Sequence, residues 1–192
     1  MGVLNIKTDN FTYADYLLWD DGKRWEIIEG WAYDMSPAPK RYHQNISGNL
    51  FNSFYNYLKG KKCQVYAAPF DVCLCEKNSS DDEIETVVQP DISIFCDTSK
   101  LNERGAKGSP DLIVEILSES TQKKDLTTKL LLYQKHSVKE YWIVDPSNKT
   151  LIINKLDSKG RYYIEKEYTS TEKVKVGIFE NFEIELESVF EE

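Results

Sequence analysis

The stretch from Val87 to Pro146 contains three short apolar runs, and these most constrain how the chain folds. The runs are VVQPDISIF, PDLIVEIL and EYWIVDP, and they are rich in the β-branched and aromatic residues that favour buried strands. Between the second and third runs lies KKDLTTKLLLYQKH, whose leucines recur at helical spacing. We therefore expect strands from the three runs and a helix from about Thr121 to His136.

Three charged residues in this stretch predict chemistry. Asp91 stands near the start of the first strand, and Glu115 lies among apolar residues in the second. A buried carboxylate is costly without a partner, so Glu115 requires a cation, a lysine or a proton. Two carboxylates from adjacent strands suit Mg²⁺ or Mn²⁺, and Lys129 on the predicted helix can orient water or stabilise charge. This set is what hydrolysis of a phosphodiester requires.

The remaining segments have their own local signals. Apolar spacing, turn residues and alternation predict two further helices, a hairpin, a polar loop and a C-terminal antiparallel meander. The predicted segments are a helix over 11–19 capped by Thr12, a hairpin turning at Glu29-Gly30, a loop from Ser36, a helix from His43 to about Gly60, a strand-like run over 63–75 and a polar loop over 98–110.

Composition limits the class of protein. With 24 basic and 32 acidic residues the net charge is -8, which argues against a protein that coats nucleic acid, although a metal-dependent site brings its own carboxylates. The sequence has no apolar run approaching the ~18 residues of a membrane span, and its start lacks the features of a signal peptide. We expect a single cytoplasmic domain over residues 1–192 and no membrane partner.

Four cysteines were considered as ligands or crosslinks. Cys63, Cys73, Cys75 and Cys96 form a C-x-C but no C-x-x-C pair, and they fall in strand-like runs. Small buried thiols are common in such runs. We therefore expect neither structural zinc nor a disulfide framework.

The sequence resembles the Uma-type family, a bacterial branch of the restriction-endonuclease-like, PD-(D/E)-x-K nuclease superfamily. The matching segments are WEIIEG, MSPAP with His43, QPD, SPDLIVEILSEST, KDLTTKLLLY and SVKEYWIVDP. The resemblance implies an α/β (α+β) fold, a restriction-endonuclease-like mixed sheet flanked by helices. It also implies a metal-dependent nuclease with nucleic acid as substrate, for which DNA is favoured and RNA stays open.

One position departs from the superfamily pattern. The usual lysine two residues after the second acid is replaced by Leu117, and the resemblance places a lysine instead at Lys129 on the following helix. Asp125, Lys129 and Tyr133 share one face of that helix, and the alternative is a surface stripe with an ordinary Asp125–Lys129 salt bridge. Glu26, an acid in the N-terminal motif, is a candidate third carboxylate, with an exposed strand glutamate as the alternative.

Weaker candidates and other functions complete the predictions. His43 at the entry of a helix is more often a cap or surface residue, and Asp111 after Pro110 is more often a turn residue. The Glu115–Lys129 pair could serve structure alone, which leaves a non-catalytic interaction or regulatory module as the alternative function. A homodimer surface is a further alternative, for which the candidate aromatic residues are Trp31, Tyr33, Tyr55 and Tyr57.

Overall fold

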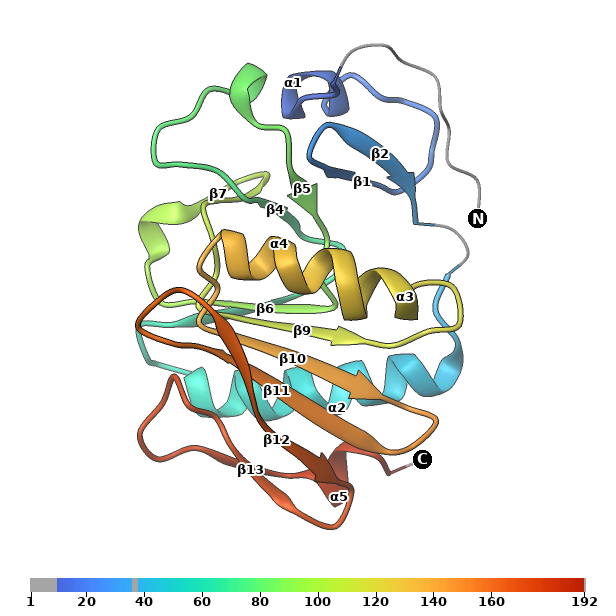
Figure 1. Cartoon of the computed structure of the whole chain (residues 1–192), viewed down its shortest axis with the longest axis vertical. Coiled ribbons are helices and arrows are strands. Elements are labelled where there is room, and N and C mark those ends of the chain that lie inside the picture. The colour runs from blue at the N-terminus through green and yellow to red at the C-terminus, as the bar shows by residue number, and fades with distance from the viewer. Residues whose placement is uncertain (1–9, 36–37, 192) are drawn as a thin grey trace. The chain divides into compact units, whose positions relative to one another are not determined.

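The computed structural model describes residues 10–35 and 38–191 (Figure 1). The predictions made for the first nine residues, and for Ser36 and Pro37 in the expected loop, lie outside the described residues. The chain divides into two compact units. The hairpin unit comprises Met1–Ala38, Pro69–Gln89 and Ser99–Ser109, and the helix unit comprises Pro39–Ala68, Pro90–Thr98 and Pro110–Glu192.

Each unit has its own mixed sheet, so the expectation of one mixed sheet holds in class but not in number. In the described part of the hairpin unit, six strands form a sheet in the order β2-β1-β5-β4-β8-β7, with β4 and β8 parallel and the other pairs antiparallel. Its elements are α1 (Tyr13–Tyr16), β1 (Trp25–Ile28), β2 (Trp31–Asp34), β4 (Asp71–Cys73), a 3-10 turn (Asp81–Glu83), β5 (Val87–Val88), β7 (Leu101–Asn102) and β8 (Gly105–Lys107).

Two local predictions in the hairpin unit are confirmed. Thr12 caps α1, because its hydroxyl accepts the Asp15 N–H while the Asp15 carboxylate accepts the Thr12 N–H. Strands β1 and β2 pair antiparallel around Glu29 and Gly30, which both have positive φ (49° and 79°). The two-residue turn selects this conformation because its twist matches the flanking strands.

The polar loop predicted over 98–110 is partly wrong, because β7 and β8 form a short antiparallel hairpin there. Gly105 starts β8 and pairs with Asp71 of β4. A Cβ at Gly105 would lie 2.2 Å from the Asp71 carbonyl oxygen, and its φ is 147°. Glycine at position 105 therefore allows the backbones of β8 and β4 to approach closely. The spacing of apolar residues does not indicate such a contact, so the sequence did not predict this strand.

The helix unit contains the long helix, the second sheet and the C-terminal strands. Its sheet order is β12-β11-β10-β9-β6-β3, with β9 and β10 parallel, and β13 pairs separately with β14. Its elements are α2 (Arg41–Leu58), β3 (Gln64–Ala67), β6 (Ile92–Phe95), β9 (Leu112–Ile116), α3 (Gln122–Lys124), α4 (Leu130–Lys135), β10 (Glu140–Asp145), β11 (Thr150–Leu156), β12 (Tyr162–Thr169), β13 (Lys173–Lys175), β14 (Glu183–Glu185) and α5 (Leu186–Val189). A 3-10 turn (Thr98–Lys100) contains the point where the chain passes from this unit to the hairpin unit.

Successive residues of a strand point to opposite faces of the sheet, so alternate residues of β9 and β10 contact different helices. Side chains such as Val114 and Trp142 join one core with Phe54 of α2, and the Phe54 and Trp142 rings lie 5.7 Å apart. On the other face Tyr141 packs edge-on against Tyr133 of α4 at 4.9 Å. Val114 and Ile116, the neighbours of Glu115 in β9, belong to the core shared with α2. Glu115 therefore projects from the other face of the sheet, toward the segment that contains α3 and α4.

The helix predicted from Thr121 to His136 is interrupted. The helix α3 leads into a π-helical turn over Asp125–Lys129, and α4 continues to Lys135. Turns of this kind are rare in proteins, and those that occur are often found at functional sites. A π-helical turn contains about one residue more than an α-helical turn. The i, i+4 spacing of a regular helix therefore predicts only approximately which side chains lie on one face of this segment.

The expectation of buried thiols in the strand-like runs is wrong for one pair of cysteines. Cys63 and Cys96 are joined, whereas Cys73 and Cys75 are free thiols. Cys63 precedes β3 and Cys96 follows β6, and the antiparallel register pairs their neighbours Gln64 and Phe95. Residues separated widely in sequence thus become cross-strand neighbours, which cysteine spacing alone does not reveal.

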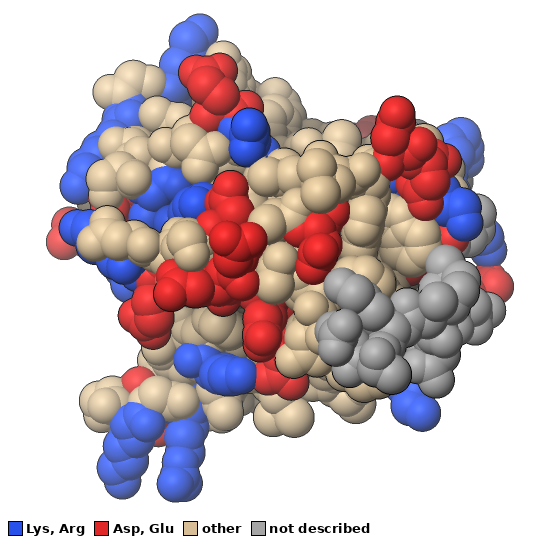
Figure 2. Space-filling model, turned by 90° about the horizontal axis from the view of Figure 1, so that it is seen from above, with Lys and Arg blue, Asp and Glu red and all other residues tan. Residues whose placement is uncertain are grey.

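The positions of the basic side chains and the hydropathy of the helices can both be compared with the composition. On the face drawn in Figure 2, lysine and arginine side chains stand in separate groups and do not form one continuous band. Within residues 10–35 and 38–191, no helix is both long enough and apolar enough to cross a membrane.

Candidate active site

Asp91 directly precedes β6, and Glu115 lies on the adjacent strand β9 of the helix unit. Strands β6 and β9 pair antiparallel with Ile92 opposite Val114, and extending that register by one residue brings Asp91 opposite Glu115. The sequence prediction of neighbouring strands is confirmed. The relative placement of the two acids therefore rests on main-chain hydrogen bonding rather than on a flexible loop.

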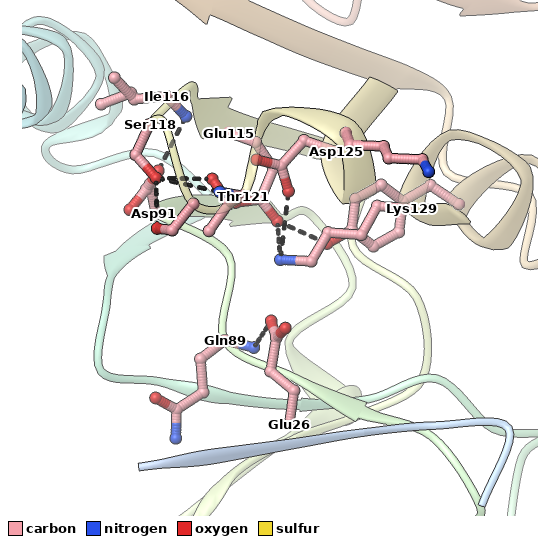
Figure 3. A network of polar contacts seen from close by, with 12 residues as sticks. Glu26, Gln89, Asp91, Glu115, Ile116, Ser118, Thr121, Asp125 and Lys129 are labelled. Atoms are coloured by element: carbon pink, nitrogen blue, oxygen red, sulfur yellow. Dashed lines mark hydrogen bonds and ion pairs between the residues drawn. The ribbon is translucent and has the colours of Figure 1, made fainter. Parts of the chain in front are cut away.

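Glu115 receives two hydrogen bonds on the same oxygen. Lys129 Nζ donates to Glu115 Oε1 at 2.8 Å, and Tyr133 Oη donates to it at 2.7 Å. All three residues are buried, with Glu115 4% and Lys129 3% exposed. Figure 3 shows Lys129 extending toward Glu115 from the helical segment. The lysine thus reaches the acid from the position predicted, although the pattern's usual position holds Leu117.

Asp125 lies beside the same lysine. Its Oδ1 is 3.8 Å from Lys129 Nζ, and its side chain is almost fully buried. The π-helical turn places both residues against the sheet, where Tyr141 Oη donates to the Asp125 carbonyl oxygen at 3.1 Å. The alternative of a solvated surface stripe is therefore wrong for Asp125, Lys129 and Tyr133, which are all buried.

Asp91 is held through its Oδ2 atom. The Ile116 N–H donates to this oxygen at 2.8 Å, and His43 Nε2 lies 3.2 Å from it. Burial lowers the pKa of His43, but the hydrogen bond and charge of Asp91 and the Ile116 carbonyl outweigh burial, so this pKa is raised above its usual value. His43 is buried in the first turn of α2, so the expectation of a surface residue is wrong.

The connection from β9 to α3 carries a hydroxyl cluster. Ser118 Oγ lies 3.1 Å from Ser120 Oγ and 2.9 Å from Thr121 Oγ1, and the Ser118 carbonyl accepts the Gln122 N–H at 2.9 Å. Figure 3 shows Ser118 and Thr121 of this cluster beside Asp91. They define where the helical segment begins, and so where its side chains project.

Glu26 belongs to the hairpin unit. It lies on β1 with no exposed surface and accepts the Gln89 N–H at 3.2 Å. The Gln89 side chain accepts from Arg24 at 2.7 and 2.9 Å and donates to Asp71 at 2.8 Å. The alternative of an exposed strand glutamate is therefore wrong. A catalytic role for Glu26 stays a prediction from the sequence.

Comparison with known proteins identifies the family. A family model described as "Uma2: Putative restriction endonuclease" matches residues 13–187. The chain belongs to the Uma2 family. It is 26% identical over 153 residues to "Uncharacterized protein slr1290" of Synechocystis sp. (strain ATCC 27184 / PCC 6803 / Kazusa), and the match covers 78% of this chain and 76% of that protein.

A solved structure shares the fold. The crystal structure of "a putative nuclease belonging to DUF820" from Anabaena variabilis ATCC 29413 aligns with a TM-score of 0.72 at 19% identity. The alignment covers 94% of this chain and 97% of the other. The mixed α/β architecture of this Uma2 chain is thus the architecture of that protein.

Asp111 and Leu117, two further positions from the sequence analysis, both make hydrogen bonds in this Uma2 chain. Asp111 directly precedes β9, where its carboxylate accepts the Cys96 N–H at 2.7 Å and pairs with Lys139 at 2.7 Å, which suits a turn residue. Leu117 is buried, and its N–H donates to the Val144 carbonyl at 2.8 Å.

The aromatic residues of the homodimer hypothesis differ in their exposure to solvent. Trp31 and Tyr55 are about half exposed, and Tyr33 and Tyr57 are less exposed.

Sequence reasoning missed several members of the site. The Tyr133 hydroxyl, the Ile116 N–H and the contact of His43 with Asp91 were not assigned roles. The spacing of Asp125, Lys129 and Tyr133 was a signal for the first, because the residues lie on one helical face. A main-chain donor and a histidine from a distant helix leave no such signal in a single sequence.

Proposed function

We propose that this Uma2 chain is a Mg²⁺- or Mn²⁺-dependent nuclease that hydrolyses phosphodiester bonds in DNA rather than RNA. The observation that carries the proposal is the 2.8 Å contact between Lys129 Nζ and Glu115 Oε1, on a strand paired with the one that follows Asp91. DNA is favoured because restriction endonucleases, which the family description names, cut DNA.

The donor chemistry fits such a metal. Asp91 and Glu115 offer hard carboxylate oxygens, and Mg²⁺ is commonly held by one or two carboxylates together with water and substrate phosphate. Among the residues that the structure describes, no group of three or more His, Cys, Asp or Glu side chains is arranged to hold an ion. The proposal is accordingly a two-carboxylate site that water and substrate would complete.

Each protein group has a distinct proposed role. A bound divalent ion would supply Lewis-acid stabilisation of the phosphate and a more acidic water. Lys129 would place a positive charge where negative charge develops, since its ammonium is already fixed by Glu115 and Asp125. Tyr133 would hold the Glu115 carboxylate in one orientation through its hydroxyl.

The test is cleavage of labelled duplex DNA, single-stranded DNA and RNA by the purified chain with Mg²⁺ or Mn²⁺. We expect Lys129→Ala to lower the rate by about 100- to 10,000-fold, the usual contribution of a positioned acid–base or charge-stabilising group. Mn²⁺ binding should remain largely intact, because the lysine does not ligate the ion. Lys123→Ala, which removes an exposed lysine of the same helical segment, is the matched control and should cleave normally.

A loss of activity in Lys129→Ala must be distinguished from a loss of folding. Lys129→Ala leaves Glu115 buried without its cation and is expected to lower stability, so rates are compared below each melting temperature. Leu117→Lys added to Lys129→Ala returns a lysine to the superfamily position and should restore part of the activity. Normal cleavage by folded Lys129→Ala would contradict the proposed role of the lysine.

One observation favours a second candidate, a non-catalytic interaction or regulatory module of the nuclease fold. Lys129 is 3% exposed and contacts two buried acids, which is the arrangement of an ion pair that serves stability alone. In that case wild type cleaves no substrate with either metal, and Lys129→Ala changes only the melting temperature. The homodimer stays a prediction from the sequence.

A further inference from the structure

His43 makes two contacts through one nitrogen. Its Nε2 lies 3.1 Å from the Ile116 carbonyl oxygen and 3.2 Å from Asp91 Oδ2. A carbonyl oxygen can only accept, so Nε2 carries a hydrogen. The other ring nitrogen, Nδ1, is buried and has no hydrogen-bond partner among the described residues. The contacts that orient this ring are therefore those of Nε2.

The same peptide unit of β9 closes a ring of contacts with the carboxylate. Ile116 donates its N–H to Asp91 Oδ2 and presents its carbonyl to His43, while His43 also contacts Oδ2. Ile116 is the residue that follows Glu115. These contacts thus join the Asp91 carboxylate to the backbone that bears the second acid.

We propose that His43 is a positioning residue, which fixes the rotation of the Asp91 carboxylate so that Oδ1 would be left available to a divalent ion. The Ile116 N–H donates to Oδ2 and His43 Nε2 lies 3.2 Å from the same atom, whereas Oδ1 accepts no hydrogen bond from the described residues. The Asp91 side chain is 19% exposed, so it is not sealed in the core. Groups that orient a ligating carboxylate typically affect metal affinity or activity about 10- to 100-fold.

A residue that replaces His43 must keep an N–H donor if it is to hold the Asp91 carboxylate. Glutamine carries an amide N–H at the end of a side chain of similar reach, so it can donate to Oδ2, whereas leucine fills the space without a donor. A purely structural histidine would be replaced best by leucine, because the site lies against the apolar core of α2 and β9.

The first measurement is Mn²⁺ affinity by electron paramagnetic resonance, with melting temperatures for every variant. This step rests on the proposed function. We expect His43→Leu to weaken Mn²⁺ binding about 10- to 100-fold, and His43→Gln to recover most of that loss. The control His136→Gln changes the other histidine of the chain and should bind as wild type does. Wild-type Mn²⁺ affinity in folded His43→Leu would overturn the proposal.

A second measurement needs no metal. The amide proton resonance of Ile116 in the ¹⁵N-labelled metal-free protein reports its hydrogen bond to Asp91. It should shift in His43→Leu in the same direction as in Asp91→Ala, and return toward the wild-type position in His43→Gln. If wild type binds no Mn²⁺, the proposed function fails, while this resonance still decides whether His43 positions Asp91. An unshifted resonance in His43→Leu would overturn the inference.

Discussion

Glu115 illustrates how a single buried acid determines its surroundings. An isolated carboxylate in an apolar strand is costly to ionise, and both donors to its Oε1 come from the helical segment that follows. The requirement for a partner could be stated from the sequence, because LIVEIL leaves no polar neighbour within the strand. The identity of one partner, Lys129, rested on the resemblance to the Uma-type family, which places a lysine on the following helix.

A second buried acid of the helix unit is predicted to make stability depend on pH. Burial raises the pKa of Glu140, although the Trp142 ring N–H and Lys155 partly oppose this. The folded protein then holds a proton more tightly than the unfolded chain. Stability from this group is therefore present at acidic pH and is lost as pH rises from the ordinary carboxyl pKa of 4.5 through the raised folded pKa.

Glu140→Gln removes that titration while keeping a side-chain oxygen for Trp142. We expect urea unfolding midpoints of this variant to gain on wild type as pH rises from acidic to neutral, since each unit of pKa difference corresponds to about 1.4 kcal/mol. An exposed glutamate variant, Glu187→Gln, should follow wild type throughout. A constant offset between Glu140→Gln and wild type across that range would contradict the prediction.

At the scale of elements, local signals predicted what local physics determines. The α1 cap, the β1–β2 turn and the apolar face of α2 follow from spacing and turn chemistry over a few residues. The π-helical turn and the β7–β8 hairpin depend on tertiary packing and backbone approach, which a single sequence does not encode locally. Strand signals likewise predicted Asp91 and Glu115, and the family resemblance pointed to Lys129, whereas the His43 and Ile116 contacts depend on tertiary packing.

The parallel pairing of β4 and β8 gives an element-scale prediction. Gly105→Ala places a Cβ 2.2 Å from the Asp71 carbonyl, so the strands must separate, and we expect a loss of about 1–3 kcal/mol in unfolding free energy. Gly160→Ala is the matched control, because its φ is also positive (73°) but its Cβ would meet no atom within 4 Å. Equal losses for the two variants in chemical denaturation would show that only backbone strain matters at Gly105.

At the scale of the whole molecule, the chain leaves each unit and returns to it. Residues 69–89 of the hairpin unit form an excursion between Ala68 and Pro90 of the helix unit. Strands β3 and β6, on either side of this excursion, pair with each other, and Cys63 and Cys96 are joined at their outer ends. Backbone pairing and a covalent bond therefore hold both ends of the excursion.

Reduction should accordingly lower stability. The bond joins cysteines separated by 33 residues, and for a loop of that size the chain-entropy relation gives about 3–4 kcal/mol. We expect the urea unfolding midpoint of wild type to fall when dithiothreitol is added, because the unfolded chain gains freedom that the crosslink had removed. The Cys63→Ser/Cys96→Ser double variant should match reduced wild type and ignore the reductant, and Cys75→Ser, which changes a free thiol, should respond as wild type does. The same midpoint with and without reductant, in protein whose free thiols are counted before and after, would show that the β3–β6 pairing alone holds the excursion.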